Sequence, residues 1–197
     1  MMFRLFRRDP SNHSIASLYG TIVAQARAAT FYRIYGVPDT VNGRFEMVVL
    51  HTVLVLRRLE SEPAAARRLG QALFDRFCGD MDGSLREMGT GDLAVPAKML
   101  KIGAAFYGRQ AAYGAALAAS APEPLIAAVQ RNVFGGETGA DLGAIRLATY
   151  VRAAADQLAA QEGQALSRAE LAFPDPEAIM VVAAETQTMA REEHQGA

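Results

Sequence analysis

The longest hydrophobic run of the chain lies between residues 44 and 60 and contains neither glycine nor proline. Within it, positions 47–56 are apolar except for His51 and Thr52. A run of about 17 residues is typical of a helix, because strands usually span about 4–8 residues. It is shorter than the roughly 20 apolar residues that cross a bilayer. We therefore predict a central helix over about 42–60, apolar on nearly every side and covered by other helices.

The rest of the chain shows the three- and four-residue spacing of amphipathic helices. Glycine, proline or capping residues separate segments of this kind at about 11–30, 64–88, 95–118, 120–134, 138–161 and 178–190. Gly36 and Pro38 predict a turn before the central helix. Ser167 and Glu170 match a capping box, although Pro174 follows closely. We expect an all-α fold, with about seven to eight helices in a single compact domain over residues 11–190, a basic apolar tail at 1–10 and a polar tail at 191–197.

Composition limits the class of protein. The 197 residues suffice for one domain with a core, and a hydrophobic content of 51% argues against general disorder. A single cysteine, Cys78, excludes an intramolecular disulfide framework and suits a reducing compartment. The first ten residues carry charges but are not followed by the apolar stretch of a secretory signal. These features indicate a cytoplasmic protein.

Charge is unevenly distributed along the chain. Residues 1–60 contain eight arginines against four acidic residues, whereas residues 131–197 contain five arginines against ten acidic residues. The basic end suits an anionic membrane surface. We expect membrane contact from the apolar and basic residues of the tail, Phe3, Arg4, Phe6, Arg7 and Arg8, and the alternative is a frayed terminus. The chain is then peripheral on the inner face of a bacterial inner membrane.

Catalytic and metal-binding patterns are weak in this sequence. His13, His51 and His194 fall in separate elements and lack the spacing of a zinc or di-iron helical site. We interpret His51 as a hydrogen-bonded core residue. Cys78 has acidic neighbours that disfavour a thiolate, so we interpret it as a packing residue. We expect no catalytic residue, no metal and no cofactor.

Binding of another polypeptide is the remaining class. A DNA-binding helix-turn-helix would follow its turn with a polar recognition helix, but here that helix is the most apolar one. We therefore expect no nucleic-acid partner. Methionine-rich helix faces form adaptable grooves for another helix. The candidates are Met81, Met88, Met99, Phe106 and Tyr107, rimmed by Asp75, Asp80, Asp82, Arg86, Lys98 and Arg109. The alternative for each is ordinary core packing. Gly79 and Gly83 interrupt a predicted helix and indicate close approach by another helix or by a bound segment.

Three segments resemble the ubiquinol–cytochrome c chaperone family. They are YGVPDTVNGRFEMVVLHTVLVLRRL (35–59), LFDRFCGDMDGSLREMGTGDLAVPAKM (73–99) and AFYGRQAAY (105–113), within a resemblance that covers roughly residues 12–160. The resemblance implies an all-helical, non-enzymatic assembly factor for ubiquinol–cytochrome c reductase. Mitochondrial members bind newly made cytochrome b, a small partner and the ribosomal exit region, and this chain lacks their long targeting extension.

The resemblance also implies which residues contact the client. Positions that match the family pattern include Tyr35, Asp39, Asn42, Arg44, Asp75, Asp82, Arg86, Asp92, Val95, Lys98, Tyr107 and Arg109. We expect substitution of Asp82 or Arg109 to weaken binding of cytochrome b without unfolding the protein. The rival function is a helical binding protein for a small apolar ligand such as a quinone or haem.

Overall fold

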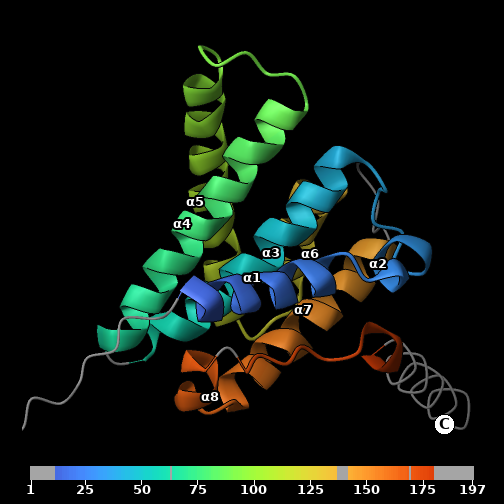
Figure 1. The fold of residues 1–197 in the computed structure, drawn as a ribbon. Helices are drawn as coiled ribbons and strands as arrows, with labels where there is room; N and C mark the ends of the chain where they lie inside the picture. The colour runs from blue at the N-terminus through green and yellow to red at the C-terminus, as the bar shows by residue number, and fades with distance from the viewer. Residues whose placement is uncertain (1–11, 63, 137–141, 169, 180–197) are drawn as a thin grey trace, which may run out of the picture.

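The computed structural model describes residues 12–62, 64–136, 142–168 and 170–179. The described part contains eight helices and no strand, which confirms the all-α prediction (Figure 1). The helices are α1 (Asn12–Ala26), α2 (Ala29–Arg33), α3 (Val41–Glu60), α4 (Ala64–Glu87), α5 (Val95–Ala118), α6 (Glu123–Val133), α7 (Leu142–Ala160) and α8 (Gly163–Ser167). None of these helices is long and apolar enough to cross a membrane.

Helix α3 is the central helix that the hydrophobic run predicts. It packs against α1, α4, α5, α6 and α7, and thirteen of its twenty residues are buried. Its first turn is capped by Thr40, whose hydroxyl accepts from the backbone N–H of Gly43 at 3.0 Å. A Cβ atom at position 43 would lie 2.0 Å from the carbonyl oxygen of Pro38. The entry to α3 therefore requires glycine at this position.

The predicted first helix, at about 11–30, is divided in two. Helix α1 ends at Ala26, and Ala28 is extended at the start of α2. The Tyr32 hydroxyl donates to the carbonyl of Ala26 at 2.8 Å and so satisfies an end of α1. Periodicity alone did not reveal this break, because its cause is an aromatic side chain further along the chain.

Two arginines bond the carbonyl groups left free at the ends of other helices. Arg58 of α3 donates to the carbonyls of Leu158 and Gln161, at the end of α7, at 2.8 and 2.7 Å. Arg152 of α7 donates to carbonyls at the end of α5, including that of Leu117 at 2.7 Å. A cation at a helix C-terminus also complements the helix dipole. These bonds tie α7 to its two neighbours.

Residues 171–177, which form no helix up to Asp175 and begin a helical turn at Pro176, cross the body and are called the strap below. Gln161, directly after α7, both donates to and accepts from the backbone of Ala172, at 2.7 and 3.0 Å. The Tyr35 hydroxyl donates to the carbonyl of Pro176 at 2.8 Å, and the ring of Phe173 lies 5.1 Å from that of His51. The strap thus covers aromatic side chains next to α3.

The C-terminal region differs from the sequence prediction in one described place. Residues 163–167 form the short helix α8, whereas the capping box predicted a helix start at Ser167. Arg168 and Glu170 instead form an ion pair at 2.8 Å after α8 ends. Most of the predicted helix at 178–190, and both predicted tails, lie outside the described residues.

Helices α4 and α5 form a long hairpin whose closing loop projects from the rest of the molecule (Figure 1). Gly89 has a φ of 79°, a left-handed conformation that favours glycine, where the chain leaves α4. Near this loop only Leu85 and Val95 are buried, and they pack outside the main core. The end of the hairpin therefore has little core of its own.

Candidate functional site

The predicted client-binding residues fall in two regions of the structure. Tyr35, Asp39, Asn42 and Arg44 lie at the turn into α3, and all the others lie on the α4–α5 hairpin. The predicted membrane-contact residues Phe3, Arg4, Phe6, Arg7 and Arg8 lie outside the described residues. The hairpin is thus where most of the candidate residues meet.

Several of the predicted client-binding residues make contacts within the fold itself. Tyr35, Val95 and Phe106 are buried, and Met81 and Met99 are partly buried. The Tyr19 hydroxyl of α1 donates to the carboxylate of Asp80 at 2.9 Å, and burial together with Asp80 raises the pKa of Tyr19. These contacts pack the hairpin onto the body.

The polar candidates at the end of the hairpin pair with one another. Arg86 bonds Asp82 at 2.7 Å, one helical turn away, and also reaches Asp92 in the loop. Lys98 donates to the hydroxyl of Thr90 at 2.9 Å. The exposed pair of Arg44 and Asp39, at 2.6 Å, plays a similar part at the turn into α3 and lowers the pKa of Asp39. These side chains brace two loops.

Arg109 forms a bidentate ion pair with the buried Glu46 of α3, at 2.6 and 2.9 Å. The Glu46 side chain is 2% exposed. Removal of Arg109 would leave a buried carboxylate without its partner, and that is strongly destabilising. The expectation that Arg109 can be substituted without loss of stability is therefore revised. Sequence reasoning did not identify Glu46, which stands in the apolar run of α3.

His51 is fully buried and has a partner on each ring nitrogen. Nδ1 lies 2.8 Å from the carbonyl oxygen of Met47, so Nδ1 carries the proton and donates. Nε2 lies 3.0 Å from the Tyr150 hydroxyl and accepts from it, while Tyr150 accepts from Gln25 at 2.9 Å. Burial lowers the pKa of His51 to about 4, so it is neutral at pH 7. This geometry agrees with a hydrogen-bonded core histidine.

Cys78 is partly buried against the core. Burial, with a contribution from Asp75, raises the pKa of its thiol, as expected for a packing residue. Across the described ranges, no three His, Cys, Asp or Glu side chains gather as a metal site would require.

The outer face of α5 carries a row of exposed residues, all small except Lys101, which we call the α5 ridge. It consists of Ala97, Lys101, Ala104, Gly108, Ala111, Ala115 and Ala118. Successive members are separated alternately by four and three residues, which is the spacing of a coiled-coil seam. Helix α5 contains no acidic residue, and the exposed Leu100 and Tyr107 flank the ridge. The surface suits close packing of another helix, because small side chains let backbones approach.

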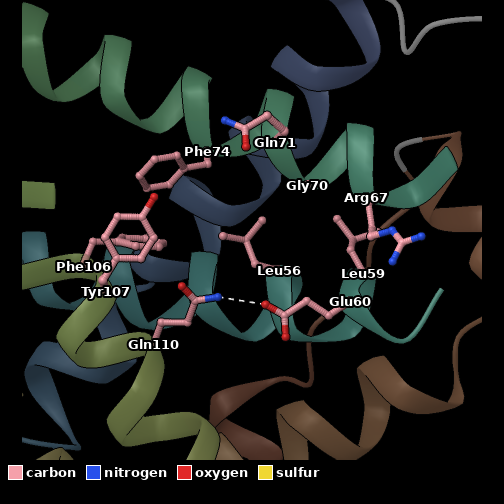
Figure 2. A pocket seen from close by; sticks show the side chains of 10 residues that line it. All are labelled: Leu56, Leu59, Glu60, Arg67, Gly70, Gln71, Phe74, Phe106, Tyr107 and Gln110. Atoms are coloured by element: carbon pink, nitrogen blue, oxygen red, sulfur yellow. Dashed lines mark hydrogen bonds between the residues drawn. The ribbon is translucent and has the colours of Figure 1, made fainter. Parts of the chain in front are cut away.

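A pocket of about 180 Å³ lies beside Tyr107, between α3, α4 and α5. Figure 2 shows Leu56 and Leu59 toward its floor, Phe74, Phe106 and Tyr107 at one end and Arg67 at the other. Gln110 donates to Glu60 at 2.9 Å along one edge. The volume is below the range of about 300–1,000 Å³ usual for small-molecule sites. A single large side chain of a partner suits it better.

A second, wider hollow of about 590 Å³ lies between α6 and α7. Leu125, Ile126 and Ile145 supply apolar lining, and Arg152 and Asp156 are its charged members. Its volume is within the range of small-molecule sites. This hollow is the feature that keeps the small-ligand function open.

Sequence reasoning missed the ridge although its signal was present. The spacing that marks buried positions of α5 also marks the exposed alanines, and alanine does not distinguish core from surface. At Gly79 and Gly83 the sequence signal was noticed, but the structure shows open space: a Cβ atom at either position would meet nothing within 4 Å. No part of the described chain lies in contact with a Cβ atom there, so the approach of another helix of this chain is not seen, while approach by a bound segment stays a prediction.

Comparison with known proteins gives two matches that cover most of the chain. A family model described as ubiquinol-cytochrome C chaperone matches residues 33–173. The crystal structure of the Cbp3 homolog from Brucella abortus is similar, with a TM-score of 0.80 and 39% identity over 90% of this chain and 98% of that chain. The comparison with curated protein sequences gives no match. The family match includes the helices that form the ridge and the pocket.

Proposed function

The chain belongs to the ubiquinol–cytochrome c chaperone family, whose role lies in assembly of ubiquinol–cytochrome c reductase, and from this premise we propose that it binds newly made cytochrome b. The observation that carries the proposal is the exposed α5 ridge beside a pocket of side-chain size. Cytochrome b is a bundle of apolar helices, and each exposes a hydrophobic surface until its neighbours are in place. An apolar helix of this client is the partner that the ridge suits.

The proposed action requires no catalysis. One client helix packs along the α5 ridge, and one of its large side chains enters the pocket near Tyr107. The small residues of the ridge allow close packing, and the pocket sets the register of the client helix. Release follows when haem binding or subunit assembly buries the same client surface. We place this action in the bacterial cytoplasm, at the inner face of the inner membrane, with the basic tail of residues 1–10 as one membrane contact.

Affinity purification from membranes of the native cells tests the proposal. Tagged wild-type protein is expected to enrich cytochrome b, and the double variant Ala104→Glu/Ala111→Glu is expected to enrich about tenfold less. Ala16→Glu, an exposed alanine of α1, is the matched control and is expected to retain the wild-type yield. Equal recovery with all three proteins would refute a role for the ridge. A photo-crosslinker at position 111, compared with one at position 16, tests direct contact.

The hollow between α6 and α7 supports the alternative function, binding of a small apolar ligand. Mass spectrometry and an absorption spectrum of purified protein test this alternative directly. A retained quinone or haem that is lost on substituting Ile145→Glu, with no cytochrome b recovered from membranes, would favour it. Recovery of cytochrome b without a bound ligand would favour the chaperone mechanism.

A further inference from the structure

The end of the α4–α5 hairpin presents large apolar side chains to solvent where little of the chain covers them. Leu93, in the loop, is 99% exposed, Leu100 is 77% exposed and Met88 is 59% exposed. A single exposed leucine is ordinary, but a group of large apolar residues at one point indicates an interaction surface. We call residues 88–101 the hairpin tip.

The shape of the tip indicates what kind of partner it meets. The loop projects beyond the other described elements, so a flat surface can touch it before touching the body (Figure 1). Most of the α5 ridge, from Ala104 onward, and the pocket lie further along the hairpin and suit a partner helix, which needs an extended face or a groove. A convex apolar tip with no groove of its own instead suits insertion into a soft, flat surface.

The charges of the tip are arranged for lipid headgroups. Lys98 and Lys101 lie about 5 and 9 Å along α5 from its start at Val95, at 1.5 Å per residue, while Leu93 precedes that start. Interfacial apolar groups enter the bilayer by about 5–10 Å while lysines stay at the level of the phosphates. The offset between Leu93 and the two lysines matches this depth.

The acidic residues of the tip weaken this attraction only in part. Arg86 bonds both Asp82 and Asp92, so Asp92 reaches the surface with a cation beside it. Glu87 is an exposed carboxylate next to Met88 and opposes the lysines. Insertion must therefore be driven mainly by the apolar side chains, with the lysines fixing the orientation at anionic phosphates.

We propose that the hairpin tip is a membrane-insertion site, in which Leu93 and Met88 enter the headgroup boundary of a bilayer and Lys98 and Lys101 contact lipid phosphates, while Leu100 lies between the two lysines along α5 and stays at their level. This site is separate from the basic tail and from the pocket beside Tyr107, although the first turns of α5 belong both to the tip and to the α5 ridge. It orients the hairpin so that the α5 ridge stands beside the bilayer rather than facing away from it.

The absence of tryptophan from the chain makes a direct test possible, because each introduced tryptophan is the sole one. The full-length variants Leu93→Trp and Leu142→Trp place a reporter at the tip and at an exposed leucine of α7 that lies outside it. Each is mixed with vesicles of neutral phosphatidylcholine, alone or with anionic phosphatidylglycerol, some carrying brominated acyl chains. Circular dichroism and melting temperature establish that both variants are folded.

We expect the emission of Leu93→Trp to shift to the blue and to be quenched by brominated lipid, most strongly in anionic vesicles, while Leu142→Trp stays unchanged. A Leu93→Asp variant is expected to bind vesicles about tenfold more weakly than wild type in flotation, and Leu142→Asp to bind as wild type. Vesicle binding without a change at position 93, or no vesicle binding, would overturn the proposal. A shift at position 93 only when a cytochrome b peptide is added would assign the tip to the client instead.

Discussion

Helices α3 and α5 are both rich in apolar residues, yet the fold uses them in opposite ways. Thirteen residues of α3 are buried, whereas only Val95, Phe106, Tyr113, Ala116 and Leu117 are buried in the longer α5. Five helices surround α3, while α5 leaves one face uncovered along its length. Apolar content alone therefore does not distinguish a helix that stabilises the fold from one that presents a binding surface. The extent to which other elements cover the helix does distinguish them. Substitutions in α3 should act mainly on folding, and those on the outer face of α5 mainly on binding.

The largest effect is expected where the two helices meet, at Glu46 and Arg109. Arg109→Ala should lower the free energy of unfolding by about 3–5 kcal/mol, because it leaves Glu46 charged and buried. Urea denaturation measures this loss. The double variant Glu46→Met/Arg109→Met is expected to recover most of it. A loss below 1 kcal/mol for Arg109→Ala would show that the pair does not bind the two helices together.

A steric effect of intermediate size is expected at the entry to α3. Gly43→Ala should cost about 1–3 kcal/mol, because the new methyl group would overlap the Pro38 carbonyl and force the backbone apart. Gly79→Ala is the matched control in α4, where the space is open, and should instead stabilise by about 1 kcal/mol. Thermal melts of both variants measure the contrast. Equal shifts in the same direction would contradict it.

A fall in pH should lower the free energy of unfolding through His51, which is buried in α3. Its pKa is about 4 in the folded protein, below the unfolded value, so the unfolded state takes up a proton first as the pH falls. The full stabilisation is present above about pH 6.5 and is lost progressively toward pH 4, by about 1–2 kcal/mol between pH 7 and 5. Urea titrations at a series of pH values measure this slope. His51→Gln does not titrate and should flatten it; an unchanged slope would assign the effect to other groups.

The smallest effect on stability is expected on the outer face of α5. Ala111→Glu should change the free energy of unfolding by less than about 0.5 kcal/mol, because the side chain stays in solvent. The same variant should nevertheless reduce recovery of cytochrome b, as proposed above. If Ala111→Glu lowered the melting temperature as much as a core truncation does, this face of α5 would have to be buried rather than exposed.

The fold was largely predictable from the sequence, because helix boundaries follow local rules. Uninterrupted apolar spacing, together with Gly36 and Pro38, located α3 to within one residue of its observed start. The break between α1 and α2 was not predictable, since it depends on Tyr32 reaching back to Ala26. The end-capping roles of Arg58 and Arg152 were also hidden, because their partners lie 33 or more positions away.

The candidate site was predictable in part. Most of the candidate residues lie on the α4–α5 hairpin, and their contact with a client stays a prediction. The intramolecular partners of Asp80, Arg86 and Arg109 were not predicted from the sequence. Leu93 and Leu100 were undervalued, because exposure of a leucine depends on the packing of distant elements. A sequence lists apolar residues but does not say which ones remain uncovered.

The contacts of the strap determine which part of this fold is completed last. Gln25 and Tyr35, made early in synthesis, bond to Pro174 and Pro176, which follow about 140 or more positions later. A ribosome must therefore release almost the whole described chain before the aromatic floor around His51 is closed. Contacts between residues so far apart in sequence form late in folding. This member of an assembly-chaperone family thus passes through an incompletely folded stage of its own, in which Phe31, His51 and Tyr150 are not yet covered by residues 171–177.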